Sequence, residues 1–310
     1  MDATARTPAP AELDRIADTE WIAEGRQDLL PSETFGFESD HVGDTLEITI
    51  VLPHAAEPTE LLSTVYVLDP TFNLKPAAAA ADMLGTFATL TGASFPSLAV
   101  VGVGYPAHDP MSVMGLRARD LTPTQDGFPA EIGAPPVPFG FGGAERFLAA
   151  LVDEVIPKTE ERFPVRERDR TLLGHSFGGL FGLYTLFHRP EVFSNYLLVS
   201  PSIWWDDRIV LSYEEQWAKE HADLQADVFL AVGDNEQDVG ETWRNESFST
   251  EALKLLRQVD NVQELTDRLR GRDYQSLSVE SMIFEGEYHL TVLPAAVTRG
   301  LLVLFDKSVS

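Results

Sequence analysis

The sequence GHSFGG at residues 174–179 lies between two apolar runs of different character. The run TLL at 171–173 is short and typical of a strand, whereas LFGLYTLF at 180–187 has the spacing of a buried helix. A serine in the pattern G-x-S-x-G between a strand and a helix sits on a sharp turn that exposes its hydroxyl. The alternative is an incidental serine in a glycine-rich turn. We interpret the stretch as a nucleophile elbow, with Ser176 as the nucleophile and the Phe177 amide as a donor to an oxyanion.

The amino-acid composition of the chain argues against some classes of binding partner. The chain has 310 residues, of which 44% are hydrophobic, and a net charge of −26 from 49 acidic and 23 basic residues. A surface this acidic repels nucleic acid and anionic membranes, so we expect neither as a partner. The charge fits a cationic substrate or a solvated surface, and its spread along the whole chain favours the second. The acid-rich, lysine-poor composition fits both a salt-rich cytoplasm and a GC-rich genome.

The chain has no cysteine, which excludes disulfides and thiolate chemistry. Its N-terminus lacks the basic segment and following apolar segment of a signal peptide. It also has no apolar run of about 18 residues, the length that a transmembrane helix needs. We therefore expect a cytoplasmic protein that does not enter a membrane.

The order of patterns predicts an N-terminal extension over residues 1–28 and a single domain over residues 29–310. Within the extension, a weak amphipathic pattern predicts a surface helix from residue 11 to about residue 25. The stretches at 33–38 and 45–52, the second of which alternates strictly, predict an antiparallel hairpin at the edge of a sheet.

Six apolar runs predict further strands, several of them buried on both faces. Helical patterns alternate with these runs, which is typical of an α/β fold. Together with the hairpin they predict a mostly parallel central sheet of about eight strands with helices on both faces. The strand runs are 63–69, 98–105, 169–173, 192–199, 226–233 and 278–284, and the helices are expected at about 77–90, 143–163, 251–269 and 292–304.

Two segments are candidates for a substrate pocket. Residues 106–141 are rich in proline with little periodicity, so we expect a long loop insertion that acts as a lid or pocket wall. Within it, Arg119 beside Asp120 either forms a local ion pair or faces the substrate. Trp204 and Trp205 follow a strand at the sheet edge where α/β proteins bind ligands. They form either the wall of an aromatic or acyl pocket, which we favour, or a cover over the core.

The second donor to the oxyanion follows from position along the chain. Enzymes with a nucleophile elbow take this donor from the loop after an early strand, here the strand at 63–69. Because Pro70 has no N–H, the donor must be the amide of Thr71 or Phe72.

Two acids, Asp234 and Glu236, follow the strand at 226–233, and both qualify as the acid of a catalytic triad. His289, on the loop after the last strand, is the one histidine that follows these acids. The chain order of Ser176, acid and His289 is that of α/β-hydrolases and differs from the orders of other serine hydrolases. Such chemistry needs neither a metal nor an organic cofactor, so we expect none.

With these motifs the chain resembles the putative-esterase branch of the α/β-hydrolases. This branch includes the ferric-siderophore esterases and, more distantly, esterase D and the antigen 85 mycolyltransferases. The resemblance implies Ser176 as nucleophile and His289 as base, and it favours Glu236 over Asp234 as the acid through a Gly-x-x-Glu match. It covers roughly residues 44–305 and is carried by YVLD at 66–69, GYP at 104–106, RARDLTP at 117–123, GGA at 142–144, GHSFGGL at 174–180, SPSIWW at 200–205, GDNE at 233–236 and GEYH at 286–289. The chain departs from the family at Asp69-Pro70, where relatives usually have Asp-Gly, so the choice of oxyanion donor stays open.

These patterns predict a serine hydrolase that acts on carboxylic esters through an acyl-enzyme. We expect a small-molecule ester as substrate. The loop with Arg119 and the pair Trp204-Trp205 suit an aromatic ester or a siderophore-type lactone. Two alternatives are an acyltransferase on the same triad and a non-catalytic binding protein of the same fold. The sequence makes no prediction of the oligomeric state.

Overall fold

The computed structural model describes residues 30–53, 59–107, 109–238 and 249–305. The proposed extension over 1–28 and its expected helix lie outside the described residues. Among the described residues, no helix is both long and apolar enough to cross a membrane.

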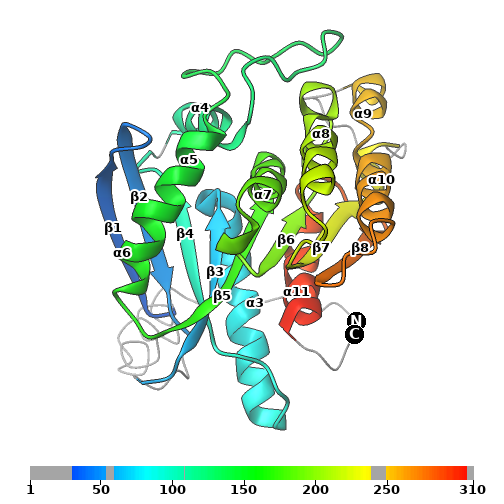
Figure 1. Ribbon diagram of the computed structural model, residues 1–310. Helices are drawn as coiled ribbons and strands as arrows, with labels where there is room; N and C mark the ends of the chain where they lie inside the picture. Colours follow the sequence, from blue (N-terminus) through cyan, green and yellow to red (C-terminus); the bar gives the residue numbers. More distant parts are fainter. Residues whose placement is uncertain (1–29, 54–58, 108, 239–248, 306–310) are drawn as a thin grey trace, which may run out of the picture.

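Eight strands form one sheet in the order β1-β2-β4-β3-β5-β6-β7-β8. The hairpin β1–β2 is antiparallel and β2 is antiparallel to β4, whereas the remaining pairs are parallel. Figure 1 shows the hairpin at one edge of the sheet and β8 at the other. The predicted sheet and its antiparallel hairpin are confirmed. The strands are β1 Ser32–Ser39, β2 Asp44–Val51, β3 Leu62–Leu68, β4 Leu98–Gly104, β5 Val165–His175, β6 Asn195–Val199, β7 Ala226–Gly233 and β8 Leu277–Phe284.

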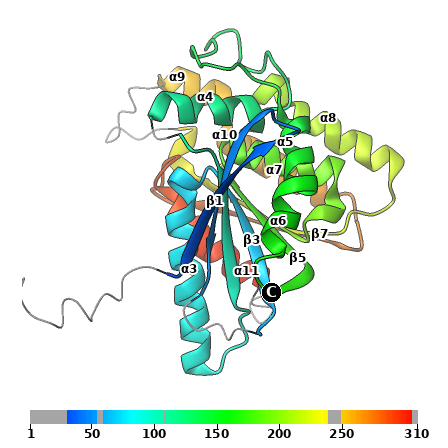
Figure 2. The same ribbon diagram turned by 90° about the vertical axis from the view of Figure 1, so that its left-hand side faces the viewer.

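Helices cover both faces of the sheet (Figure 2). On one face α3 and α11 pack against each other and over the central strands. On the other face α7 packs on β5 and β6, and α10 packs on β7 and β8. β3 and β4 are buried along their whole length because they lie between these two layers. The helices are α3 Pro70–Thr91, α4 Pro110–Leu121, α5 Ala144–Ala150, α6 Ile156–Glu160, α7 Phe177–His188, α8 Trp205–Glu220, α9 Thr250–Leu256, α10 Gln258–Arg270 and α11 Val292–Phe305.

Helix α3 begins directly after β3, at Pro70, and not at residue 77 as predicted. Proline is well suited to the first position of a helix, because its fixed φ is helical and its missing N–H would have no partner there. Asp69, with a left-handed φ of 54°, makes the turn from strand to helix. The predicted loop is therefore the first turns of a helix, which continues past Pro76.

The predicted loop at 106–141 is wrong for its first part, which contains helix α4. Pro110 occupies the first turn of α4, and the Asp109 side chain caps it by accepting a hydrogen bond from the Ser112 amide at 2.9 Å. The proline that suggested a loop is instead a helix start. Residues 122–143 form no helix or strand. They pass over the end of the sheet near which α4 and α9 lie (Figure 1).

The predicted helix at 143–163 is interrupted. α5 and α6 are joined by a wider π turn, Leu151–Val155. Pro157 follows at the start of α6 and cannot donate to the carbonyl four residues earlier, so a local change of helical pitch before it is expected. The predicted helix at 251–269 is divided into α9 and α10 at Arg257, which has a left-handed φ of 50°. Helix α8 has no counterpart among the predicted helices.

Candidate active site

Ser176 lies in the sharp turn between β5 and α7. Its φ of 61° and ψ of −117° are strained for a residue with a side chain. The turn is tight enough that a Cβ on Gly174 would lie 2.1 Å from the carbonyl oxygen of Gly178, so only glycine fits there. The Ser176 amide donates to the carbonyl of Val199 at 3.0 Å, which ties the elbow to β6. The serine is thus fixed by backbone contacts while its side chain faces a cavity.

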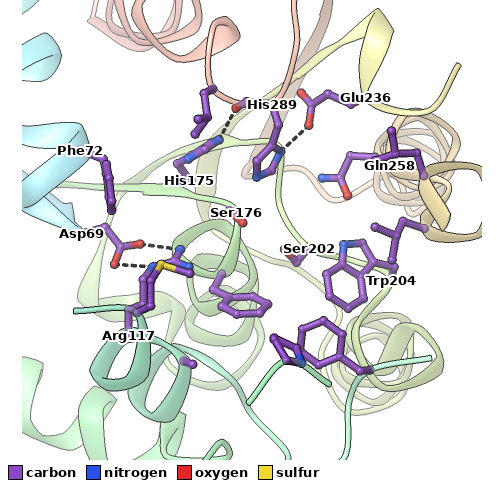
Figure 3. Close-up of a pocket in the computed structure, with 18 of the residues that line it drawn as sticks. Asp69, Phe72, Arg117, His175, Ser176, Ser202, Trp204, Glu236, Gln258 and His289 are labelled. Atoms are coloured by element: carbon purple, nitrogen blue, oxygen red, sulfur yellow. Dashed lines mark hydrogen bonds and ion pairs between the residues drawn. The ribbon is translucent and has the colours of Figure 1, made fainter. Parts of the chain in front are cut away.

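Glu236 and His289 are hydrogen-bonded to each other beside this serine. The Nδ1 atom of His289 lies 2.6 Å from Oε2 of Glu236. The other oxygen of Glu236 accepts hydrogen bonds from the Ser200 hydroxyl at 2.6 Å and the Gly233 amide at 2.7 Å. A carboxylate only accepts, so His289 donates this hydrogen bond from Nδ1. Figure 3 shows the His289 ring between Glu236 and Ser176.

The structure distinguishes the two candidate acids. Asp234 accepts a hydrogen bond from the Gly286 amide at 2.8 Å and braces the loop that carries His289. Glu236, with only 2% of its side chain exposed, is the acid in contact with the imidazole. Sequence reasoning left this choice open because both residues belong to the same short turn after β7.

His175 supports the histidine loop, a contact that sequence reasoning missed. Its Nε2 atom donates to the backbone carbonyl of His289 at 2.7 Å, and the two rings lie 4.5 Å apart. Burial, together with the nearby His289, lowers the pKa of His175 well below its usual value. His175 is therefore a neutral hydrogen-bond donor that ties the residue before the elbow serine to the loop after β8.

Residues at the N-termini of two helices, α3 and α7, line the cavity. Phe177 is the first residue of α7, so its amide has no partner within the helix. Thr71 and Phe72 lie in the first turn of α3, and the Phe72 amide already donates to the carbonyl of Asp69 at 3.0 Å. Of the two candidates, the Thr71 amide is therefore the better placed to donate to an oxyanion, and the Phe72 side chain lines the cavity.

Arg119 does not line the cavity, so the substrate-facing interpretation of this residue is wrong. It donates to Asp120 at 2.8 and 2.7 Å and to Asp44 at 3.1 Å, which is the local ion pair that the sequence also allowed. Arg117 lines the cavity instead and binds Asp69 through two hydrogen bonds of 2.9 Å. Residues two apart on a helix point to nearly opposite sides, so only one of the two arginines can face the site. Recognition of α4 as a helix would have revealed this.

The two neighbouring tryptophans also lie in different environments. Trp204 lines the cavity, whereas Trp205 is completely buried and donates from Nε1 to the Thr124 hydroxyl at 2.9 Å. Trp204 therefore lies in the cavity wall, and its contact with a substrate stays a prediction. The prediction of a pocket wall is wrong for Trp205, which belongs to the core. The cavity measures about 410 Å³ and has an aromatic side formed by Phe128, Phe141, Phe177 and Trp204.

No group of three or more His, Asp or Glu side chains in the described part of the chain could hold a metal ion. Residues 39–281 match the model of the family described as putative esterase. The chain belongs to the putative esterase family. The chain is therefore a hydrolase that acts on esters, and the matched segment contains both Ser176 and Glu236.

Relatives of this esterase act on siderophores. It is 30% identical over 265 residues to the ferri-bacillibactin esterase BesA of Bacillus subtilis, with 83% of each chain covered. It is 30% identical over 288 residues to the siderophore triacetylfusarinine C esterase of Aspergillus fumigatus, covering 89% of this chain and 93% of the relative.

Solved structures of similar proteins share the α/β-hydrolase fold of the esterase. The crystal structure of the BES protein from Bacillus cereus has a TM-score of 0.72 at 29% identity and covers 89% of this chain and 95% of that one. The siderophore hydrolase EstA from Aspergillus nidulans has a TM-score of 0.77 at 24% identity and covers 99% and 100% of the two chains. Because EstA is only 24% identical to this chain, its similarity shows the fold alone.

Proposed function

We propose that this esterase cleaves its substrate with a triad of Ser176, His289 and Glu236, through a covalent acyl-enzyme. The observation that carries the proposal is the 2.6 Å contact between His289 and the buried Glu236, in the same cavity as the strained Ser176. A nucleophile, a base within its reach and an acid that orients the base are the three parts this chemistry requires.

The reaction follows from the positions of these groups. Nε2 of His289 takes the proton from the Ser176 hydroxyl as the oxygen attacks the ester carbonyl. Glu236 holds the Nδ1–H tautomer and stabilises the imidazolium that forms. The tetrahedral oxyanion accepts hydrogen bonds from the amides of Phe177 and Thr71. His289 then returns the proton to the leaving alkoxide, and a water activated by His289 releases the acid and restores Ser176.

For the substrate we propose an aromatic ester or a siderophore-type lactone. The relatives named above act on siderophores, and the aromatic side of the cavity around Trp204 offers edge-to-face contacts to a ring. In this proposal Trp204 keeps the substrate contact that the sequence assigned to it, Trp205 loses its contact, and Arg117 takes the place of Arg119.

Substitution of the two tryptophans should have different consequences. Trp204→Ala should lower the ratio of kcat/KM for 4-nitrophenyl benzoate to that for 4-nitrophenyl butyrate by about 2- to 10-fold, because an aromatic contact is lost. Trp205→Ala should leave this ratio unchanged and lower the free energy of unfolding by about 3–5 kcal/mol, because it opens a cavity in the core. Steady-state kinetics and urea unfolding measure both. An unchanged ratio in Trp204→Ala would contradict the aromatic pocket.

The acyl-enzyme can be tested directly. We expect a burst of 4-nitrophenol from 4-nitrophenyl acetate, equal to the enzyme concentration, when acylation is faster than deacylation. A fluorophosphonate should block turnover and add its mass to the peptide that contains Ser176. Turnover with labelling at another residue, or with none, would contradict the mechanism. If added alcohols give new esters at the expense of hydrolysis, acyl transfer is the better description of the activity.

A further inference from the structure

The positive charge of the arginine that lines the cavity is paired within the protein. Arg117 is the one arginine or lysine among the described residues that line it. Its Nε and Nη2 atoms donate to the two oxygens of Asp69, each at 2.9 Å, and both side chains are more than nine-tenths buried. The guanidinium also lies over the Phe177 ring, 5.1 Å from its centre. Figure 3 shows this pair facing the cavity beside Ser176.

The other titratable groups of the cavity add no free positive charge. Glu236 is paired with His289 and is almost completely buried. His175 is neutral at ordinary pH, because burial lowers its pKa. Among the described residues that line the cavity, a bound anion would therefore find no cation that is not already engaged by a carboxylate.

The rest of the described lining is mainly apolar, with Phe72, Met114, Val137, Trp204, Leu256 and Leu290 among its members. An anion that enters such a site loses its hydration and gains no ionic partner, which is strongly unfavourable. The net charge of −26 adds a repulsion that acts at longer range and is screened by salt.

We propose that this cavity selects esters without net charge and discriminates against anionic ones. The inference rests on the proposed function, because it concerns the same cavity and nucleophile. Among ester-linked iron chelates, three singly charged ligand groups around Fe³⁺ give a neutral complex, and three doubly charged groups give a complex of charge 3−. The charge of the lining favours the first class, as well as uncharged aryl esters.

The test compares two near-isosteric substrates, 4-nitrophenyl 4-carbamoylbenzoate, which is neutral, and 4-nitrophenyl 4-carboxybenzoate, which is anionic. Each kcat/KM is divided by the rate constant for reaction of the same ester with hydroxide, which removes the difference in intrinsic reactivity. We expect the neutral ester to be favoured at least tenfold, at 50 mM and at 1 M NaCl, because desolvation in the cavity is not screened. Equal normalised values would overturn the inference while leaving the proposed function intact.

Two variants shift the charge of the cavity in opposite directions. Asp69→Asn leaves the Arg117 cation without its partner and should move the ratio toward the anionic ester by at least tenfold, even if both rates fall. Arg117→Met leaves Asp69 unpaired and should increase the preference for the neutral ester. Asp44→Asn removes the same charge from the ion pair of Arg119 outside the cavity, and it should leave the ratio unchanged.

The outcomes separate the two proposals. A ratio that shifts as much in Asp44→Asn as in Asp69→Asn would overturn the inference, because overall charge would then explain the selectivity. If neither ester is hydrolysed and a fluorophosphonate does not label Ser176, the proposed function fails and this inference fails with it. Hydrolysis of both esters that is blocked by the fluorophosphonate retains the function, and the ratio alone then decides the inference.

Discussion

Ser176→Ala should lower kcat for 4-nitrophenyl acetate by about 10⁵- to 10⁶-fold, the loss expected when the nucleophile of a triad is removed. Without the Ser176 oxygen, no acyl-enzyme forms, and only the oxyanion donors and substrate binding still assist attack by water. Alanine meets the same strained φ as serine, so the fold should not change. Stopped-flow and steady-state rates, with circular dichroism and thermal unfolding of the same samples, measure both effects.

Ser202→Ala is the matched control for this experiment. Ser202 lines the same cavity, is buried, and donates from its amide to the carbonyl of Ser176 at 3.1 Å. Its hydroxyl has no role in the proposed mechanism, so the variant should keep kcat within about tenfold of the wild type. More than 1% of wild-type turnover in Ser176→Ala, confirmed as free of contaminating esterase, would exclude Ser176 as the nucleophile.

Glu236→Gln should lower kcat by about 10⁴-fold, as observed when the acid of other triads is replaced. The amide that replaces the carboxylate no longer stabilises the imidazolium, and it can donate to Nδ1 and thereby favour the wrong tautomer. The variant keeps the volume of the side chain, which is held among the Ser200 hydroxyl, the Gly233 amide and His289. The pH profile of kcat and the unfolding curve of the variant separate loss of catalysis from loss of fold.

Asp234→Asn is the comparison that makes this result informative. Asp234 lies two residues earlier in the same turn. Its contact described above is the hydrogen bond that it accepts from the Gly286 amide, and an asparagine oxygen can accept the same bond. We expect less than about a threefold change in kcat. If Asp234→Asn were the more damaging substitution, the acid would be misassigned, and the contact of Glu236 with His289 would be structural.

The sequence predicted the parts of this site that depend on local pattern. The elbow at Ser176 and the position of His289 after the last strand follow from glycine spacing and from the order of strands. The choices that stayed open or proved wrong concern neighbouring residues, namely Asp234 against Glu236, Arg117 against Arg119, and Trp204 against Trp205. Spacing places such residues at the end of a strand, but the direction of each side chain depends on packing that a single sequence does not contain.

The errors in the fold have a common physical origin. Pro70 and Pro110 were interpreted as parts of loops, whereas each lies in the first turn of a helix, where proline is favoured. The missed start of α3 and the missed helix α4 hid the pair Asp69–Arg117, because these residues meet only when both elements are placed. The buried strands were predictable because their apolar runs need no knowledge of partners.

The order of the catalytic groups along the chain also bears on how the enzyme is made. His289 follows His175 of the elbow by 114 residues, and Glu236 lies between them. At a translation rate of about 5–20 residues per second, Ser176 is synthesised roughly 6–23 s before His289, its proposed base. Over that interval the nascent chain carries the elbow serine without a partner to deprotonate it. Under the proposed mechanism, Ser176 therefore stays unreactive on the nascent chain until β8 joins the sheet and brings His289 to the elbow.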